Sequence, residues 1–356
     1  MWDAQGREYI DCIGGHGVAI VGHANPQVAE AVAAQARKLL VCPGSFCNDV
    51  RAELLAELVG IAPDGLARAF LCNSGAEAVE GALKIARLIT GRKRFVAAMR
   101  GFHGRTLGAL SVTWRREYRA PFEPLIPEVS FVPYNDVTAL EEVLSGGDVA
   151  GVILEVVQGE GGVIPGKGEY LKEAQELCRK AGALFIVDEV QTGFGRTGRM
   201  FACEHCGLEP DLLCLAKGIA GGVPMGAVLI HERLGGMTPR RHGSTFGGSP
   251  LACAAALAAI RFIVKESLPQ RAAELGAYFM EKLRGIDSPA IREVRGLGLM
   301  VGVELKERAG PYLSELAERG ILALSAGATV IRFLPPLVIS REELDQVVAA
   351  LSEVLP

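Results

Sequence analysis

Two short apolar runs that each end in a charged residue place the strongest constraint on how this chain folds. Leu184 to Val187 leads into Asp188, and Leu212 to Ala216 leads into Lys217. Short apolar runs bounded by Gly or Pro are typical of strands buried on both faces, as in a parallel sheet. Because such sheets bind ligands at the carboxyl ends of their strands, we expect Asp188 and Lys217 to point into one crevice.

The residue types at these two strand ends suit carbonyl chemistry. Burial favours the neutral form of a lysine such as Lys217, and a neutral amine can attack an aldehyde to form a Schiff base. A carboxylate on a neighbouring strand, here Asp188, can hold a pyridinium nitrogen protonated, as pyridoxal 5'-phosphate (PLP) enzymes require. The spacing alone leaves a second interpretation open, in which Asp188 caps a turn and Lys217 extends to water.

The order of the predicted elements indicates the fold class. Strands and helices alternate up to the central region, which predicts a doubly wound α/β sheet. From Ile291 onward, short strands interleave with helices, which predicts a smaller α+β unit. We expect an N-terminal segment at 1–30, a large domain at 31–285 and a small C-terminal domain at 286–356. The earlier predicted strands are Arg68 to Cys72, Phe95 to Met99, Val129 to Val132 and Ala150 to Val157.

Composition excludes several classes of protein. The 356 residues are 49% hydrophobic and 22% charged, as expected of a folded globular chain. The net charge of −4 gives no reason to expect nucleic acid or an anionic membrane as a partner. No apolar run is long enough to span a membrane and no signal peptide is visible, so we expect a cytoplasmic protein. The nine cysteines are expected to be reduced thiols, and no metal site is expected.

Two glycine-containing loops are candidate ligand sites. The stretch Asn73-Ser74-Gly75-Ala76-Glu77 joins a predicted strand to a predicted helix. Free N–H groups at a helix start can bind a phosphate, but Ser or Asn followed by Glu is also an ordinary helix cap, and the two interpretations weigh equally here. The second loop is Gly101 to Thr106, where glycines on both sides of Phe102 and His103 allow close approach to a ligand.

Two further patterns support other functions only weakly. Gly193 to Gly198 matches the GxGxxG pattern of nicotinamide-dependent dehydrogenases, but the first glycine is separated from the strand and no helix start follows. Cys203 and Cys206 have the CxxC spacing of zinc or redox sites, yet no second pair lies at the right distance. A dehydrogenase therefore remains the alternative from a different class.

With these motifs assembled, the chain resembles the class III (ornithine-type) PLP-dependent aminotransferases of fold type I over nearly its whole length. The resemblance implies a mixed, mostly parallel seven-stranded sheet in the large domain. Within the family, it is nearest to the acetylornithine aminotransferases and to enzymes that act on a lysine linked to a carrier protein. The motifs that carry it are Gly22 to Pro26, Asn73 to Glu77, Gly101 to Thr106, Gln158 to Gly162, Asp188 to Gly198, Leu215 to Lys217 and Ser244 to Gly248.

The resemblance implies a role for each residue of a cofactor site. Lys217 would form the Schiff base with PLP and then move the proton between substrate and cofactor. Asp188 would pair with the pyridine nitrogen. The remaining cofactor contacts would be Ser74, Gly75 and Ala76 at the phosphate, Phe102 stacked on the ring, Gln191 at the phenolic oxygen, and Thr245 at the phosphate of the other subunit of a homodimer.

The resemblance also implies how two substrates share the site. Arg332 would bind the α-carboxylate of glutamate, and Arg105 would bind a second substrate carboxylate. Glu160 would act as a switch that pairs with Arg332 when an ω-amino substrate is bound and moves away for glutamate or 2-oxoglutarate. An unpaired guanidinium in a dry pocket would otherwise disfavour the substrate without a carboxylate there. His16 and Ser244 are the other expected substrate contacts.

The sequence departs from the family pattern at several places. The family has further residues before Trp2, which we expect to be missing from this chain. His16 stands where relatives carry a Tyr, Val156 replaces a Pro, and Ser249 replaces an Asn. These departures bear on the substrate more than on the cofactor.

The sequence therefore predicts transfer of an ω-amino group to 2-oxoglutarate from N-acetylornithine, or from an acetylated or carrier-linked lysine. Alternatives within the fold are an ornithine or 4-aminobutyrate aminotransferase, an aminomutase of the glutamate-semialdehyde kind, and a protein without activity. A small acidic carrier protein would require a basic rim at the pocket entrance. The candidates for this rim are Arg115, Arg116, Arg119, Arg240 and Arg241.

Overall fold

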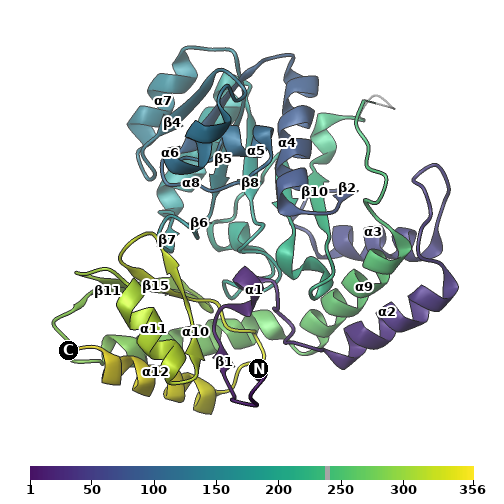
Figure 1. Ribbon diagram of the computed structural model, residues 1–356. Coiled ribbons are helices and arrows are strands. Elements are labelled where there is room, and N and C mark those ends of the chain that lie inside the picture. The colour runs from purple at the N-terminus through teal and green to yellow at the C-terminus, as the bar shows by residue number, and fades with distance from the viewer. Residues whose placement is uncertain (237–240) are drawn as a thin grey trace.

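Seven strands form one mixed sheet at the centre of the larger part of the molecule (Figure 1). The computed structural model describes residues 1–236 and 241–356. The strand order is β2-β10-β9-β8-β5-β3-β4; β10 runs antiparallel to both of its neighbours, and the other pairs are parallel. The predicted mixed, mostly parallel sheet is confirmed. The strands are β2 (Arg68–Cys72), β3 (Arg94–Ala98), β4 (Val129–Val132), β5 (Val149–Glu155), β8 (Leu184–Asp188), β9 (Leu212–Leu215) and β10 (Gly226–Ile230).

Both faces of this sheet are covered, which accounts for the continuous apolar runs in its strands. Along β8, Leu184 and Ile186 belong to the core that α4 (Gly75–Thr90) closes on one face. Phe185 and Val187 belong to the core on the opposite face. That second core includes residues of α3 (Asp49–Ile61), α7 (Val137–Ser145) and α8 (Gly168–Ala181). Alternate side chains of one strand thus enter two different cores.

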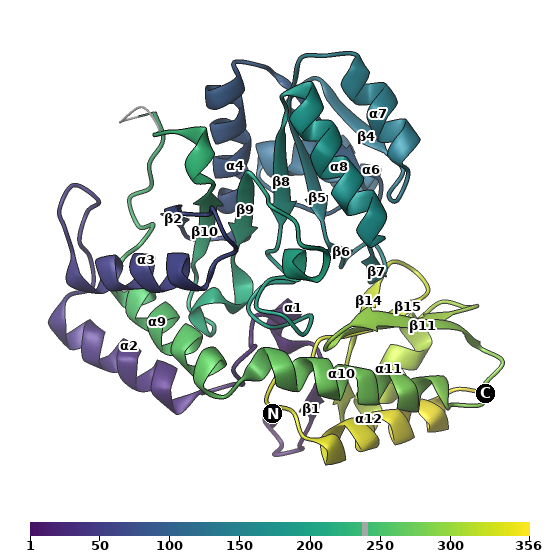
Figure 2. The ribbon, with the colours of Figure 1, turned by 180° about the vertical axis from the view of Figure 1, so that it is seen from behind.

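Further helices lie around the sheet. The helix α9 (Pro250–Lys265) packs against both α2 (Pro26–Lys38) and α3 (Figure 2). Asn25 caps α2 by accepting the N–H groups of Gln27 and Val28, as expected of Asn before Pro. Short segments complete this part of the chain: α1 (Gly14–Gly17), α5 (Leu107–Ser111), α6 (Arg116–Arg119), η1 (Ala120–Phe122), β6 (Val157–Gln158), β7 (Ile164–Pro165), η2 (Ala202–Cys206), η3 (Lys217–Ala220) and η4 (Glu232–Leu234).

The C-terminal part is a separate α+β layer, as predicted. Its antiparallel sheet has the order β11-β12-β15-β14. The helix α10 (Leu268–Arg284) packs against β11 and β12 of this sheet and against α12. The other elements are β11 (Ile291–Leu297), β12 (Met300–Leu305), α11 (Gly310–Glu318), β13 (Ile321–Leu322), β14 (Leu324–Ala326), β15 (Val330–Phe333) and α12 (Arg341–Val354).

The start of the N-terminal segment lies against the C-terminal unit. The strand β1 (Ile10–Asp11) pairs in parallel with β13, and the N-terminus lies beside the small unit in both views (Figures 1 and 2). Trp2 and Glu8 form an isolated antiparallel bridge near the N-terminus. The domain limits of 30 and 285 stay predictions, and α10 is the helix that leads from one unit to the other.

None of the helices in the described residues is both long enough and apolar enough to cross a membrane.

Two helical glycines provide a matched test of how α10 is packed. Gly276 of α10 lies against the backbone of Gly298, and a methyl group there would overlap the Gly298 carbonyl. Gly60 of α3 has open space around it. We expect Gly276→Ala to lower the free energy of unfolding by about 1–3 kcal/mol through overpacking. Gly60→Ala should raise it by up to about 1 kcal/mol through helix propensity.

Differential scanning calorimetry of both variants checks this prediction. Gly276→Ala should have a lower unfolding midpoint than the unchanged protein, and Gly60→Ala a higher one. A Gly276→Ala midpoint at or above that of the unchanged protein would contradict the close contact between α10 and the turn at Gly298.

Candidate active site

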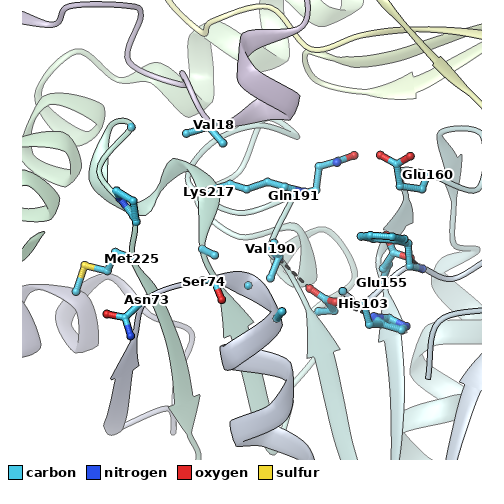
Figure 3. Close-up of a pocket in the computed structure, with 18 of the residues that line it drawn as sticks. Val18, Asn73, Ser74, His103, Glu155, Glu160, Val190, Gln191, Lys217 and Met225 are labelled. Atoms are coloured by element: carbon cyan, nitrogen blue, oxygen red, sulfur yellow. Dashed lines mark hydrogen bonds and ion pairs between the residues drawn. The ribbon is translucent and has the colours of Figure 1, made fainter. Parts of the chain in front are cut away.

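The carboxyl ends of the central strands meet at a cavity of about 360 Å³ (Figure 3). Asp188 is the last residue of β8, and Lys217 begins η3 just after β9. Both side chains line the cavity, as the strand ends predict. Lys217 has a φ of 46°, in the left-handed region that residues with a side chain rarely adopt. Such strained positions cluster at functional sites, so this backbone geometry marks Lys217 independently of its charge.

Asp188 is buried in a hydrogen-bonded pair with His103. Nδ1 of His103 donates to Oδ2 of Asp188 at 2.7 Å, and the N–H of Val190 donates to Oδ1 at 3.0 Å. Burial alone would lower the pKa of His103, but the hydrogen bond to Asp188 and the charges of Asp188 and Glu155 outweigh it and raise the pKa. The pair therefore favours an imidazolium beside a carboxylate. Within the described residues, Nε2 of His103 is buried without a hydrogen-bond partner.

The surroundings of Lys217 favour its neutral amine. Burial lowers the pKa of Lys217, and the positive charge of Arg332 lowers it further. The negative charges of Asp188, Glu160 and Glu155 oppose this shift without cancelling it. A lysine with a lowered pKa in a cavity has the properties of an amine nucleophile.

The start of α4 is both a helix cap and a wall of the cavity. Oγ of Ser74 accepts the N–H of Glu77 at 3.1 Å, and Oε2 of Glu77 accepts the N–H of Asn73 at 2.5 Å, which confirms the cap. Ser74, Gly75 and Ala76 nevertheless line the cavity. The N–H groups of Gly75 and Ala76 have no acceptor among the hydrogen bonds of the described residues. The two interpretations of this stretch are therefore compatible, because the cap uses other donors.

A buried ion pair joins the two units at the edge of the cavity. Nη1 of Arg332, on β15 of the small unit, lies 2.6 Å from Oε1 of Glu160 in the turn between β6 and β7. The arginine side chain is 1% exposed and the glutamate 31%. Nη1 also lies 3.4 Å from Oε1 of Gln191. Glu160 and Gln191 line the cavity, whereas Arg332 does not line it and only contacts these two lining residues.

Two residues that line the cavity, His103 and Glu155, are not among the site residues predicted from the sequence. Glu155 ends β5 directly opposite Asp188 of β8. Burial raises the pKa of Glu155 to about 7; His103 and two backbone N–H groups lower it, and Asp188 raises it further. The rule that found Asp188, a charge at the end of a buried strand, applies equally to Glu155. His103 could have been found from the glycines on both sides of it.

Phe102 lines the cavity, but five other predicted site residues do not: Arg332, which contacts two lining residues, and Arg105, Thr245, His16 and Ser244. Arg105 is exposed, with its guanidinium carbon 4.3 Å from the centre of the Tyr118 ring. Thr245 and His16 are also exposed. Oγ of Ser244 accepts from Nδ2 of Asn73, a lining residue, at 3.1 Å. This one chain therefore does not bring Arg105, Thr245, Ser244 and His16 into the cavity.

The two weak alternative motifs both serve packing in this structure. The loop from Gly193 to Gly198 consists of turns and opens no helix. Arg196 within it is fully buried and donates to the carbonyls of Leu299 and Pro335, so this segment packs against the small unit. Cys203 is buried, and no group of three or more His, Cys, Asp or Glu in the described chain could hold a metal ion. All nine cysteines are free.

Comparison with known proteins shows the family. The model of the class-III aminotransferases matches residues 1–355. The chain is 53% identical to a LysW-aminoadipate semialdehyde transaminase from Deinococcus radiodurans, over 100% of this chain and 83% of the relative. It is 49% identical to an acetylornithine aminotransferase from Methanosarcina acetivorans, over 99% of this chain and 88% of the relative.

A solved structure supports the same family assignment. The ornithine aminotransferase from Toxoplasma gondii, crystallised with PLP at partial occupancy in its active site, superposes with a TM-score of 0.93. It is 38% identical, over 99% of this chain and 86% of that one. These matches exclude the dehydrogenase alternative. The sheet order, the cavity at its carboxyl edge and the family match over residues 1–355 lead to one conclusion: the chain belongs to the class III aminotransferases.

Proposed function

We propose that this aminotransferase moves the terminal amino group of N-acetylornithine, or of a carrier-linked lysine, to 2-oxoglutarate, with a semialdehyde and glutamate as products. The observation that carries the proposal is the buried pair of Arg332 and Glu160 beside the cavity that holds Lys217 and Asp188. A guanidinium whose partner can move suits an enzyme that must bind one substrate with a carboxylate at this place and one without. The names of the two relatives with 53% and 49% identity support the choice of substrates.

The donor groups around the cavity fit PLP. The free N–H groups at the start of α4, together with Ser74, suit a phosphate, since a helix N-terminus attracts an anion. Val190 lies so close to Gly75 that an added Cβ would approach Cγ1 of Val190 at 2.7 Å, so glycine is needed at this position. Asp188 supplies a buried carboxylate for a pyridinium and Lys217 an amine for an aldehyde. Class III aminotransferases use PLP, and when bound it supplies an electron sink for the carbon next to the transferred nitrogen.

The residues of this chain would then do the following work. Lys217, as a neutral amine, would take the proton from the substrate carbon and so move it between the substrate and the cofactor. Asp188, which accepts a hydrogen bond from His103, would pair with the ring nitrogen. Phe102 would stack on the ring, and Gln191 would hydrogen-bond the phenolic oxygen. These roles follow the family resemblance and the cavity lining together.

The exposed site residues are proposed to act in a homodimer. Class III aminotransferases are generally dimeric. The exposed position of Thr245, outside its own cavity, agrees with a role at the phosphate of the partner's site. Arg105, Ser244 and His16 are proposed to complete the substrate pocket once two chains and substrate are together.

A basic groove next to the cavity is the proposed docking surface for an acidic carrier protein. The groove has a volume of about 1010 Å³ and includes Arg115, Arg116 and Arg119, three of the five candidates for the basic rim. It also includes Gly161, which directly follows Glu160 of the cavity wall. Arg241 does not line it, and Arg240 lies outside the described residues. The other groove residues with charge are Arg100, Arg292, Arg295, Glu117, Glu123 and Glu304.

The role of Lys217 can be tested by chemical trapping. After incubation with PLP and borohydride reduction, the peptide that contains Lys217 should carry the cofactor, because its neutral amine reacts with the aldehyde. Lys217→Ala should lose the label and lower activity by at least about 10²–10⁴-fold, since the proton carrier is removed. Mass spectrometry and glutamate formation measure the two effects. The control is Lys38→Ala, an exposed lysine on α2. Label on another lysine, with activity retained in Lys217→Ala, would contradict the assignment.

The role of Arg332 can be tested by comparing two half-reactions. Arg332→Ala should raise KM for glutamate by about 100-fold, because a buried charge partner of its carboxylate is lost. KM for N-acetylornithine should change far less, since that donor places no carboxylate beside Arg332. Arg292→Ala, an exposed arginine in the same small sheet, is the control. Equal changes of KM for both substrates would argue against the two-substrate role of Arg332.

The docking groove can be tested by charge reversal. Arg115→Glu combined with Arg116→Glu should weaken use of a carrier-linked lysine about tenfold or more at low salt, through lost charge complementarity, and the loss should shrink as salt rises. The effect on N-acetylornithine should be much smaller. Steady-state kinetics with both donors at two ionic strengths measure this. Equal loss for both donors at every salt concentration would place the effect in the catalytic site and not in docking.

A further inference from the structure

Glu155 joins two loops of the cavity through its two carboxylate oxygens. It ends β5, and it is 7% exposed. Oε1 accepts the N–H of Phe102 at 3.0 Å, in the loop after β3. Oε2 accepts the N–H of Gly159 at 3.2 Å, in the turn that follows β6. Neither N–H has another acceptor among the hydrogen bonds of the described residues, so both depend on this one side chain.

The position of Gly159 affects the ion pair next to it. Gly159 immediately precedes Glu160, whose carboxylate pairs with Arg332 at 2.6 Å. The backbone of Gly159 also lies directly against Gln191, since a Cβ at residue 159 would overlap the amide group of Gln191. Gln191 in turn approaches Arg332 at 3.4 Å. Both groups beside the arginine are therefore positioned by the segment that Glu155 holds.

The Phe102 loop, which is the other segment that Glu155 holds, leads to the hydrogen-bonded pair of His103 and Asp188. Phe102 directly precedes His103, whose N–H donates to Oγ1 of Thr113 at 2.9 Å and whose ring donates to Asp188. Glu155 thus holds the loop that presents one aromatic ring and one imidazole to the cavity. The same carboxylate holds the turn that presents Glu160.

We propose that Glu155 is a positioning residue that couples the Phe102 loop to the Glu160 turn and so stabilises the paired state of Glu160 and Arg332. This inference rests on the proposed function, in which that paired state receives the ω-amino substrate. A carboxylate is needed because both bound groups are donors, and only two acceptor oxygens satisfy both. An amide has one acceptor oxygen, and its NH2 group faces a donor.

The test compares Glu155→Gln with Thr113→Val in the PLP-loaded protein. Glu155→Gln keeps size and shape but removes one acceptor. Thr113→Val removes the acceptor of the His103 N–H and so loosens the Phe102 loop without contact to Gly159. Nε2 of Gln158 donates to the carbonyl of Met99 at 2.9 Å, and neither substitution removes a group of this hydrogen bond between the two segments.

The first readout is hydrogen–deuterium exchange, which does not depend on activity. In Glu155→Gln, amides of both segments, 99–105 and 157–162, should exchange about tenfold faster, the loss expected for a hydrogen bond to a charged group. In Thr113→Val, only segment 99–105 should change. Faster exchange in segment 99–105 alone for Glu155→Gln would overturn the coupling.

The second readout is the KM of each half-reaction. Glu155→Gln should raise KM for N-acetylornithine about tenfold while KM for glutamate stays within about twofold, because glutamate brings its own carboxylate to Arg332. Thr113→Val should not change the ratio of the two values. An equal change for both substrates in Glu155→Gln would overturn the proposal. If the unchanged protein used neither donor but both segments loosened as expected, the proposed substrates would be wrong and the coupling by Glu155 would stand.

Discussion

The parallel pairing of β5, β8 and β9 is the constraint on which the site depends. Because the three strands run in one direction, their carboxyl ends lie at one edge of the sheet, with Glu155 opposite Asp188 and Asp188 opposite Cys214. Two carboxylates and a lysine are thereby brought to a dry edge where a lone charge would be costly. His103 offsets part of that cost by donating to Asp188, and backbone N–H groups offset a further part by donating to Asp188 and Glu155.

The second constraint lies at the junction of the two units. Arg332 comes from the small sheet and Glu160 from a turn of the large unit, and the arginine is almost completely buried. A buried guanidinium requires a partner, so the two units are held together at the point where the substrate must bind. In the proposed function, substrate choice depends on this same pair of side chains. This is a physical reason for one cavity to accept two unlike amino donors in turn.

Much of the fold and part of the site could be predicted from the sequence. Strand ends identified Asp188 and Lys217 because a charge that ends an apolar run in a buried sheet must lie at the edge where ligands bind. The role of the start of α4 could not be decided from the sequence, because a helix cap and a phosphate site use the same residue types. The structure shows that the cap leaves the N–H groups of Gly75 and Ala76 without an acceptor in the described residues. Glu155 ends a buried strand and His103 lies between glycines, so both had a local signal, but the hydrogen bonds that give them their roles join segments distant in sequence.

The site residues predicted only from the family resemblance fall into two groups in the structure. Arg332 and Glu160 lie together as the resemblance implies, although no local pattern pairs residues so far apart in the chain. Thr245 and Arg105 lie outside the cavity of one chain, and their proposed roles involve a partner subunit or a bound substrate. A sequence motif identifies such residues, but their geometry belongs to the assembled enzyme.

We expect the nitrogen of an ω-amino donor to pass through this cavity to 2-oxoglutarate. The most direct measurement uses N-acetylornithine labelled with nitrogen-15 at its terminal amine, with a carrier-linked lysine labelled in the same way as the second donor. Nuclear magnetic resonance then follows the label after unlabelled 2-oxoglutarate is added. We predict nitrogen-15 in glutamate from at least one donor, and only when 2-oxoglutarate is present. Absence of label in glutamate from both donors, or movement of nitrogen within a donor without 2-oxoglutarate, would contradict transfer to 2-oxoglutarate.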